Sequence, residues 1–269
     1  MRRLTGIAGA LVVGASCAMA HAQPHGTDFV VRVHDSALEL GAVGDGGVVV
    51  YPSVVRSAEF GAEGFANFTN DPGVDSQPGQ LVPGMAIGFD VLAALREWDG
   101  EDFDAISDDT VSVRDSSVIL ATTPAEDEVV PGDVFGTADN DAGAVFHNHV
   151  QFFLNYPSTT VVDGVWLFQW RLWTETPGIA PSETAYVVFA QGAGLADLDD
   201  AVDWVEANLV APVCFADCDG TGVLNVDDID CYVAGFLGGD LGVADCDANG
   251  VLNVDDIDCF VTSFLGGCP

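Results

Sequence analysis

Short stretches in which apolar and polar residues alternate recur along the chain as far as residue 190. Such alternation is typical of half-buried β-strands, and the Gly- and Pro-rich segments between the stretches are typical of turns. The strands predicted in this way are residues 27–33, 48–51, 146–155, 165–174 and 186–190. The pattern predicts a mainly β domain over residues 23–210, an antiparallel β-sandwich with minor helices.

Two of these strands separate an apolar face from a more polar one. Successive side chains of a strand point to opposite faces, so residues 146–155 place Val150, Phe152 and Leu154 together on the side expected to be buried. In residues 165–174 the apolar face consists of Trp166, Phe168, Trp170 and Leu172.

Helical periodicity replaces alternation in two segments of this domain. Asp90 is a suitable N-cap for a short helix that ends at Trp98. Residues 195–209 predict an amphipathic helix, with Leu and Val on its inner face and carboxylates on its outer face. Residues 211–213, Ala-Pro-Val, are predicted to be a linker to a second domain, residues 214–269.

The second domain contains one pattern written twice, at an offset of 28 residues. In each copy an Asp-rich loop precedes apolar residues with helical spacing. These residues are Ile229, Tyr232, Val233 and Phe236 in the first copy and Ile257, Phe260, Val261 and Phe264 in the second. Because a unit of this length cannot bury its apolar side alone, the two copies are expected to pack on each other as a small α-helical module.

Each Asp-rich loop has the spacing of an EF-hand-type calcium loop, in which positions 1, 3, 5, 7, 9 and 12 supply oxygen ligands and position 6 is Gly. The predicted ligands are Asp217, Asp219, Thr221, the Val223 carbonyl, Asn225 and Asp228 in the first loop, and Asp245, Asp247, Asn249, the Val251 carbonyl, Asn253 and Asp256 in the second. The sequence thus predicts two Ca²⁺ sites. Thr221 offers a neutral hydroxyl where the second loop has an amide, so the first site is expected to be weaker. The competing interpretation is a loop that only caps a helix.

Six of the seven cysteines fall in the second domain. An even number of cysteines in a small exported domain predicts a disulfide framework. The duplication favours the pairs Cys218–Cys231 and Cys246–Cys259, which repeat one spacing, and leaves Cys214–Cys268 to join the two ends of the module. A zinc site is the alternative, although the close spacing of a zinc knuckle is missing.

Residues 1–22 have the three parts of a secretory signal peptide: two arginines, an apolar stretch and a small-residue cleavage site. The protein is therefore expected to be secreted, outside the cell or on its surface. No other segment is apolar for the ~18 residues that a transmembrane helix needs. A net charge of −35 argues against binding to nucleic acid or to an anionic membrane surface.

The duplicated loop and helix, with Asp at position 12 and the ending Gly267-Cys268-Pro269, resembles the dockerin family, and more closely its cysteine-flanked GC-type members. The resemblance implies calcium-dependent docking to a cohesin-like or cell-surface attachment protein, often in extracellular polysaccharide handling. In dockerins loop positions 10 and 11 select the partner, which here are Val226 and Asp227, repeated as Val254 and Asp255. Phrases of the first domain, among them HNHVQFFLN and IGFDVLAALREWDG, are similar to a group of exported bacterial proteins that end in differing C-terminal anchors.

Two histidines are the sharpest chemical feature of the first domain. His147 and His149 lie two residues apart on one predicted strand, so both imidazoles could hold one Cu or Zn ion. His34 or Asp35, directly after the strand predicted at residues 27–33, is the expected third ligand if that strand lies beside the one with the histidines. The alternative is a polar outer face with no ligand.

Two further functions stay open for the first domain. Trp173, with Gln169 and Arg171 beside it, could form a platform on which a sugar ring stacks. The common motifs for nucleophilic, zinc-dependent and phosphate-binding enzymes are missing, so the sequence favours a protein that is not an enzyme. The many carboxylates leave open an O-glycosyl hydrolase, which needs only a suitably spaced pair.

Overall fold

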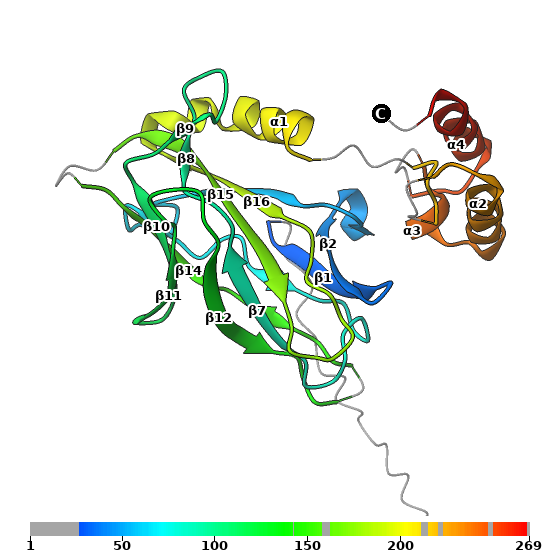
Figure 1. Ribbon diagram of the computed structural model, residues 1–269, viewed down its shortest axis with the longest axis horizontal. Coiled ribbons are helices and arrows are strands. Elements are labelled where there is room, and N and C mark those ends of the chain that lie inside the picture. The colour runs from blue at the N-terminus through cyan, green and yellow to red at the C-terminus, as the bar shows by residue number, and fades with distance from the viewer. Residues whose placement is uncertain are drawn as a thin grey trace, which may run out of the picture.

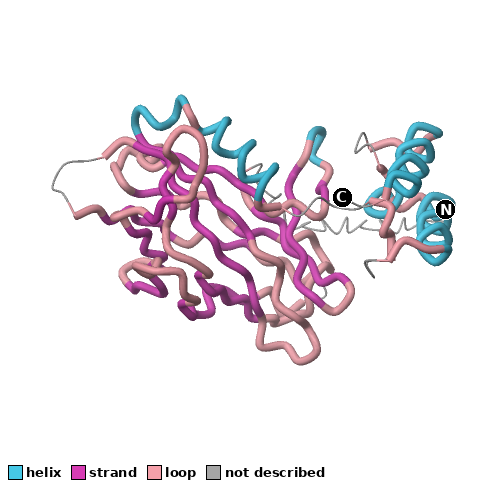
Figure 2. Tube along the Cα trace, turned by 45° about the horizontal axis from the view of Figure 1, so that its top comes forward, coloured by secondary structure: helices cyan, strands magenta, loops and turns pink. Residues whose placement is uncertain are grey.

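The structure, a computed structural model, describes residues 27–141, 143–157, 162–210, 215–219, 223–246 and 250–267. The predicted mainly β fold is confirmed, since 35% of the described residues are strand and 21% are helix. The strands lie between Phe29 and Gln191, and three helices, α2 (Val226–Gly238), α3 (Leu241–Ala244) and α4 (Val254–Gly266), group together near the C-terminus (Figures 1 and 2).

The strands are β1 (Phe29–His34), β2 (Ala37–Val43), β3 (Val49–Val50), β4 (Val55–Glu59), β5 (Phe68–Thr69), β6 (Val74–Asp75), β7 (Ala86–Val91), β8 (Arg96–Glu97), β9 (Ala105–Ile106), β10 (Thr110–Asp115), β11 (Val118–Thr122), β12 (Val130–Thr137), β13 (His147–Asn148), β14 (Gln151–Asn155), β15 (Gly164–Trp173) and β16 (Ala185–Gln191). The helices are the 3₁₀ turns η1 (Asp45–Gly47) and η2 (Gly192–Ala196), and the α-helices α1 (Leu198–Asn208), α2 (Val226–Gly238), α3 (Leu241–Ala244) and α4 (Val254–Gly266).

Within the described residues the strands form three sheets. Their orders are β13-β6-β1-β2-β3, β11-β10-β14-β5 and β12-β7-β15-β16-β4, with β8 and β9 attached to β15 in the third. Most neighbours are antiparallel, but β1 pairs with β6, and β16 with β4, in parallel. The predicted antiparallel β-sandwich is therefore shown only in part, as a mainly β fold with mixed and antiparallel sheets, because alternation of side chains carries no information about strand direction.

Aromatic side chains join the three sheets around one core. Phe152 of β14 lies 5.7 Å from Phe168 and 5.8 Å from Trp170 of β15, measured between ring centroids. Phe29 of β1 lies 6.1 Å from the same Trp170 ring. The two predicted apolar faces are confirmed, because all of their residues are buried: Val150, Phe152, Leu154, Trp166, Phe168, Trp170 and Leu172.

The helix predicted from Asp90 to Trp98 is wrong. This segment is the end of β7, followed by a turn and by β8. Asp90 lies opposite Arg171 in the β7–β15 register. One of its carboxylate oxygens accepts hydrogen bonds from Nε of Arg171 at 3.0 Å and from Nη2 at 2.9 Å. The cross-strand ion pair and the buried Val91 hold the chain extended, which overrides the local helical spacing.

The other helices agree better with the sequence. The amphipathic segment 195–209 becomes η2 and then α1, whose buried residues belong to the main core. In the second domain α2 and α4 begin at equivalent positions, and the rings of Tyr232 and Phe260 stack 4.0 Å apart at an angle of 9°. The two copies thus pack on each other as the duplication predicts. The short α3 between them was not predicted.

Candidate metal centres

The first Asp-rich loop brings three carboxylates together. One oxygen from each of Asp217, Asp219 and Asp228 lies within 4.8 Å of the other two, so the three could hold one metal ion. Asp228 is fully buried, Asp217 is half-buried and Asp219 is exposed. The cluster therefore consists of one carboxylate fixed inside the module and two that reach it from the loop.

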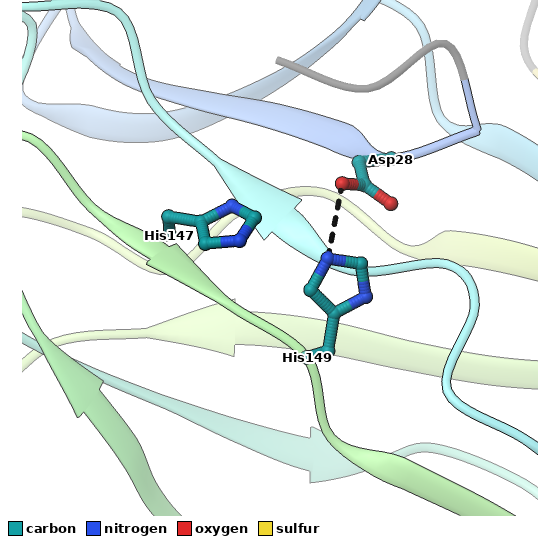
Figure 3. Close-up of side chains that lie close together, drawn as sticks. All are labelled: Asp28, His147 and His149. Carbon is teal, nitrogen blue, oxygen red and sulfur yellow. Dashed lines mark ion pairs between the residues drawn. The ribbon is translucent and has the colours of Figure 1, made fainter. Parts of the chain in front are cut away.

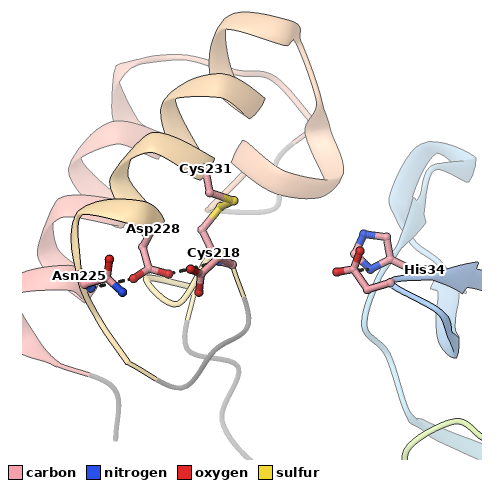
Figure 4. Close-up of a disulfide and its surroundings, with 7 residues drawn as sticks. His34, Cys218, Asn225, Asp228 and Cys231 are labelled. Carbon is pink, nitrogen blue, oxygen red and sulfur yellow. Dashed lines mark hydrogen bonds and ion pairs between the residues drawn. A yellow bond between two sulfur atoms is a disulfide. The ribbon is translucent and has the colours of Figure 1, made fainter. Parts of the chain in front are cut away.

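The first turn of α2 fixes Asp228. Asn225 is the N-cap, and its side chain accepts a hydrogen bond of 2.7 Å from the Asp227 N–H. Asp228 in turn accepts 2.8 Å from the Asn225 N–H and 3.2 Å from the Asp219 N–H (Figure 4). These donors, the Asn225 N–H first, lower the pKa of Asp228 and keep it ionised.

Asn225, which was predicted only as an ion ligand, also forms hydrogen bonds that stabilise the loop and the start of α2. Its side-chain oxygen caps α2, and its amide nitrogen donates to the Val223 carbonyl at 3.0 Å. Both atoms therefore stabilise the loop itself, and a water molecule would be needed between this side chain and an ion, as is common at loop position 9. The capping box joins the two interpretations of the sequence, since the loop caps the helix and also gathers carboxylates.

The second loop repeats much of this geometry. Asp256 is fully buried and accepts a hydrogen bond of 2.8 Å from the Asn253 N–H, and Asn253 caps α4. Asp245 accepts 2.8 Å from the Gly250 N–H. The predicted ligands Thr221, Asp247 and Asn249 and the turn residue Gly222 lie outside the described residues. The first loop therefore has a carboxylate cluster that could hold a metal ion, while calcium as that ion and a second site at this loop both stay predictions.

Disulfides tie each loop to its helix. Cys218 pairs with Cys231 (Figure 4) and Cys246 with Cys259, and the Cα atoms are 5.8 Å apart in both pairs. The two predicted pairs are confirmed, and the alternative of zinc binding by these four cysteines is wrong. Disulfides of this kind indicate an oxidising environment. Cys214 and Cys268 lie outside the described residues, so their pairing is untested.

A second cluster lies in the first domain. Asp28, His147 and His149 each offer a ligand atom, and these atoms lie within 4.8 Å of one another (Figure 3). The Nε2 atom of His149 is 3.4 Å from an oxygen of Asp28, which is fully buried. The side chains of His147 and His149 are 37% and 18% exposed, so the cluster opens to solvent on the histidine side.

Strand pairing assembles this cluster. Asp28 precedes β1, which runs parallel to β6, and β6 pairs with β13, so that His147 lies opposite Asp75. The Nδ1 atom of His147 contacts the buried Asp75 carboxylate, and Nδ1 of His149 lies 2.8 Å from the Asn70 carbonyl oxygen. Each imidazole is therefore oriented by an oxygen atom that contacts its Nδ1 atom.

Backbone contacts fix the remaining positions. The Gly73 N–H donates 2.7 Å to Asp28, while burial is the main effect that raises the pKa of Asp28. A Cβ atom at Gly73 would lie 2.5 Å from the His149 ring, so only Gly allows this close approach.

The expected third ligand of the histidines is wrong. His34 lies at the far end of β1, with its Nδ1 atom 3.7 Å from carboxylate oxygens of Asp35 and Glu39. At a rise of about 3.3 Å per residue it is roughly 20 Å from Asp28. The structure also divides the predicted strand 146–155, since β13 and β14 belong to different sheets. The one sequence feature that points to this ligand is Asp28, an Asp at the start of the first predicted strand. The sequence does not show which strands are neighbours, so it could not place Asp28 beside the histidines.

The predicted sugar platform is only partly available. Trp173 is half-buried and packs closely over Gly88, and Arg171 is paired with Asp90. Trp166 and Trp170 are core residues, as predicted. Sugar binding at Trp173 and Gln169 is untested.

No helix in the described part of the chain is long and apolar enough to cross a membrane. No protein-family model matches the sequence, and a search of curated proteins gave no match.

Proposed function

We propose that this is an exported calcium-binding protein whose C-terminal module, residues 214–269, attaches the β domain to a partner. The observation that carries the proposal is the convergence of Asp217, Asp219 and Asp228. Carboxylate oxygens are hard ligands suited to Ca²⁺, and their spacing in the chain is that of a calcium loop. The dockerin resemblance of the module supports the same function.

Exposed apolar side chains support the docking part of the proposal. Val233 and Leu237 on α2 and the equivalent Val261 and Leu265 on α4 are all exposed. Between the two helices lies an apolar groove of about 340 Å³. Contiguous apolar surface of this kind is typical of a protein–protein interface, and a cohesin-like or cell-surface attachment protein fits it. Extracellular polysaccharide handling is the proposed setting.

Calcium titration by calorimetry, with circular dichroism alongside, tests the calcium site on the full oxidised chain. We expect calcium binding with a gain of helical signal, because the free energy of binding to a site that the unfolded chain lacks adds to the free energy of folding. Asp228→Asn should weaken binding at the first loop on the order of 10-fold, because it removes one ligand charge. The matched control is Asp230→Asn, an exposed position outside the loop.

Loss of calcium binding in the control as well as in Asp228→Asn would show a nonspecific effect of acidic charge. Absence of calcium binding in the unaltered chain would overturn the proposal. The two loops can be ranked in the same experiment, since Asp245→Ala is expected to weaken binding more than Thr221→Ala.

Docking is tested separately. Leu237→Ser combined with Val261→Ser, two exposed residues that line the groove, should retain calcium binding and lose calcium-dependent attachment to the surface of cells that export the protein. Attachment that survives both substitutions would remove the apolar groove from the proposal.

A further inference from the structure

We propose that Asp28, His147 and His149 form a zinc site in the β domain, separate from the calcium loops. Nitrogen and carboxylate ligands together suit Zn²⁺, whereas the Asp-rich loops offer oxygen ligands alone, which suit Ca²⁺. The two kinds of site would therefore select different ions in one chain.

One distance within the cluster matches that expected for a tetrahedral ion. Zn–N and Zn–O bonds of about 2.0–2.1 Å at the tetrahedral angle place two ligand atoms roughly 3.3 Å apart. The observed separation of His149 Nε2 from the Asp28 oxygen is 3.4 Å. The ligand atom of His147 lies within 4.8 Å of both, on the side chain that solvent reaches most easily. A small side-chain rotation of His147 completes the set.

Groups behind the histidines orient them for this role. A zinc-binding histidine usually donates a hydrogen bond from its second ring nitrogen to a carboxylate or a carbonyl oxygen. This bond fixes the tautomer and the ring plane. Asp75 contacts Nδ1 of His147, and the Asn70 carbonyl lies 2.8 Å from Nδ1 of His149. The zinc ligand on each ring would then be its Nε2 atom, which in His149 already lies 3.4 Å from an oxygen of Asp28.

Charge favours the same assignment. The cluster contains two buried carboxylates, Asp28 and Asp75, and two imidazoles. A third carboxylate, Asp71, lies 3.6 Å from Nδ1 of His149, and a divalent cation bound by the three ligands would offset the carboxylate charge at this site. Three protein ligands on one side leave a fourth position toward solvent, where a water molecule or another ligand completes the tetrahedron.

Zinc titration of the full chain, saturated with calcium beforehand, tests the site by calorimetry. We expect one equivalent of Zn²⁺ to bind, and His149→Ala or Asp28→Asn to abolish that event. Asp75→Asn, which disturbs the orientation of His147 and the neighbouring Asp28 without removing a ligand, should weaken zinc binding by roughly 10- to 100-fold. The matched control, His34→Ala, removes an exposed histidine of the same domain and should leave binding unchanged.

Co²⁺ provides a second measurement that folding defects cannot imitate. Tetrahedral nitrogen and oxygen ligands give Co²⁺ strong visible absorption, which we expect in the unaltered chain and which His147→Ala, at the solvent side, should remove without loss of the folded state by circular dichroism. Zinc binding that persists in both His147→Ala and His149→Ala, or that disappears in Asp228→Asn, would overturn the proposal and place the ion in the calcium loops. Absence of zinc binding in the calcium-loaded chain would overturn it too.

Discussion

Tyr51 shows how one side chain can be held at a cost to stability. Its hydroxyl is buried, and within the described residues nothing forms a hydrogen bond with it. Its ring lies 4.0 Å below the Arg32 guanidinium and against Gly41, where a Cβ would lie 2.5 Å from the ring. The aromatic ring is therefore required by packing, while the hydroxyl is not.

Tyr51→Phe is expected to leave the free energy of unfolding unchanged or to raise it by up to about 1–3 kcal/mol, because a buried hydroxyl without a partner is removed. Urea denaturation measures the change. The control is Tyr186→Phe, whose hydroxyl donates to the Leu209 carbonyl at 3.2 Å and whose loss should cost about 1 kcal/mol. A clear loss of stability in Tyr51→Phe would show that water or a residue outside the described part satisfies the hydroxyl.

Burial raises the pKa of Tyr51 from its ordinary value of 10.0 to about 12. The folded state therefore keeps the proton longer than the unfolded chain does. The stability that this difference supplies is complete below pH 10 and is lost as the pH rises through about 12. Unfolding free energies of the unaltered chain and of Tyr51→Phe, compared at about pH 9 and about pH 11, should diverge in favour of the variant at the higher pH. A constant difference would contradict the raised pKa.

At the scale of the element, the first turns of α2 and α4 combine structure with ligand placement. In both helices Asn is the N-cap, and the side chain of the Asp three residues later accepts a hydrogen bond from the Asn N–H. The same reciprocal bonds that start the helix position a buried carboxylate at the end of the Asp-rich loop. Helix formation and ion binding are therefore expected to be coupled.

Asn225→Ala should lower the stability of the calcium-free C-terminal module by about 1 kcal/mol, the usual cost of losing an N-cap. Thermal unfolding followed by circular dichroism measures this effect without calcium, which removes any contribution from ion binding. Asn225→Ser keeps a capping oxygen and should recover most of the loss. Equal destabilisation by Ala and Ser would mean that the bond from the Asn225 amide to the Val223 carbonyl, and not the cap, is what matters.

At the scale of the whole molecule, the two domains have separate cores and separate means of stabilisation. The main core consists of residues of the β domain, and a small second core joins Tyr232, Ala244 and Phe260. The two described disulfides both lie in the C-terminal module. Reduction and calcium removal are therefore expected to act on one domain only.

The chain offers a simple measurement of this independence, because all five tryptophans lie in the β domain. A chelator together with a reductant should lower the helical circular dichroism signal and leave tryptophan emission unchanged. Heating should then change the emission in a separate transition. A change of emission that coincides with the loss of helix would show that the domains unfold together.

The sequence alone was sufficient where neighbours in the chain are also neighbours in space. The offset between the two copies predicted the pairs Cys218–Cys231 and Cys246–Cys259, because each pair lies within one loop and its helix. The spacing of Asp217, Asp219 and Asp228 predicted their convergence for the same reason. Alternation likewise identified the buried faces of β14 and β15, since it depends only on the local backbone.

Only the tertiary structure decided the features that depend on which strands are adjacent. Asp28 is over a hundred residues from His147 and His149, and it joins them because β6 lies between β1 and β13. Asp90 pairs across β7 and β15 with Arg171, so a segment with helical spacing is extended. The physical reason is the same in both cases: side-chain periodicity determines the faces of an element, whereas long-range burial and pairing determine its neighbours.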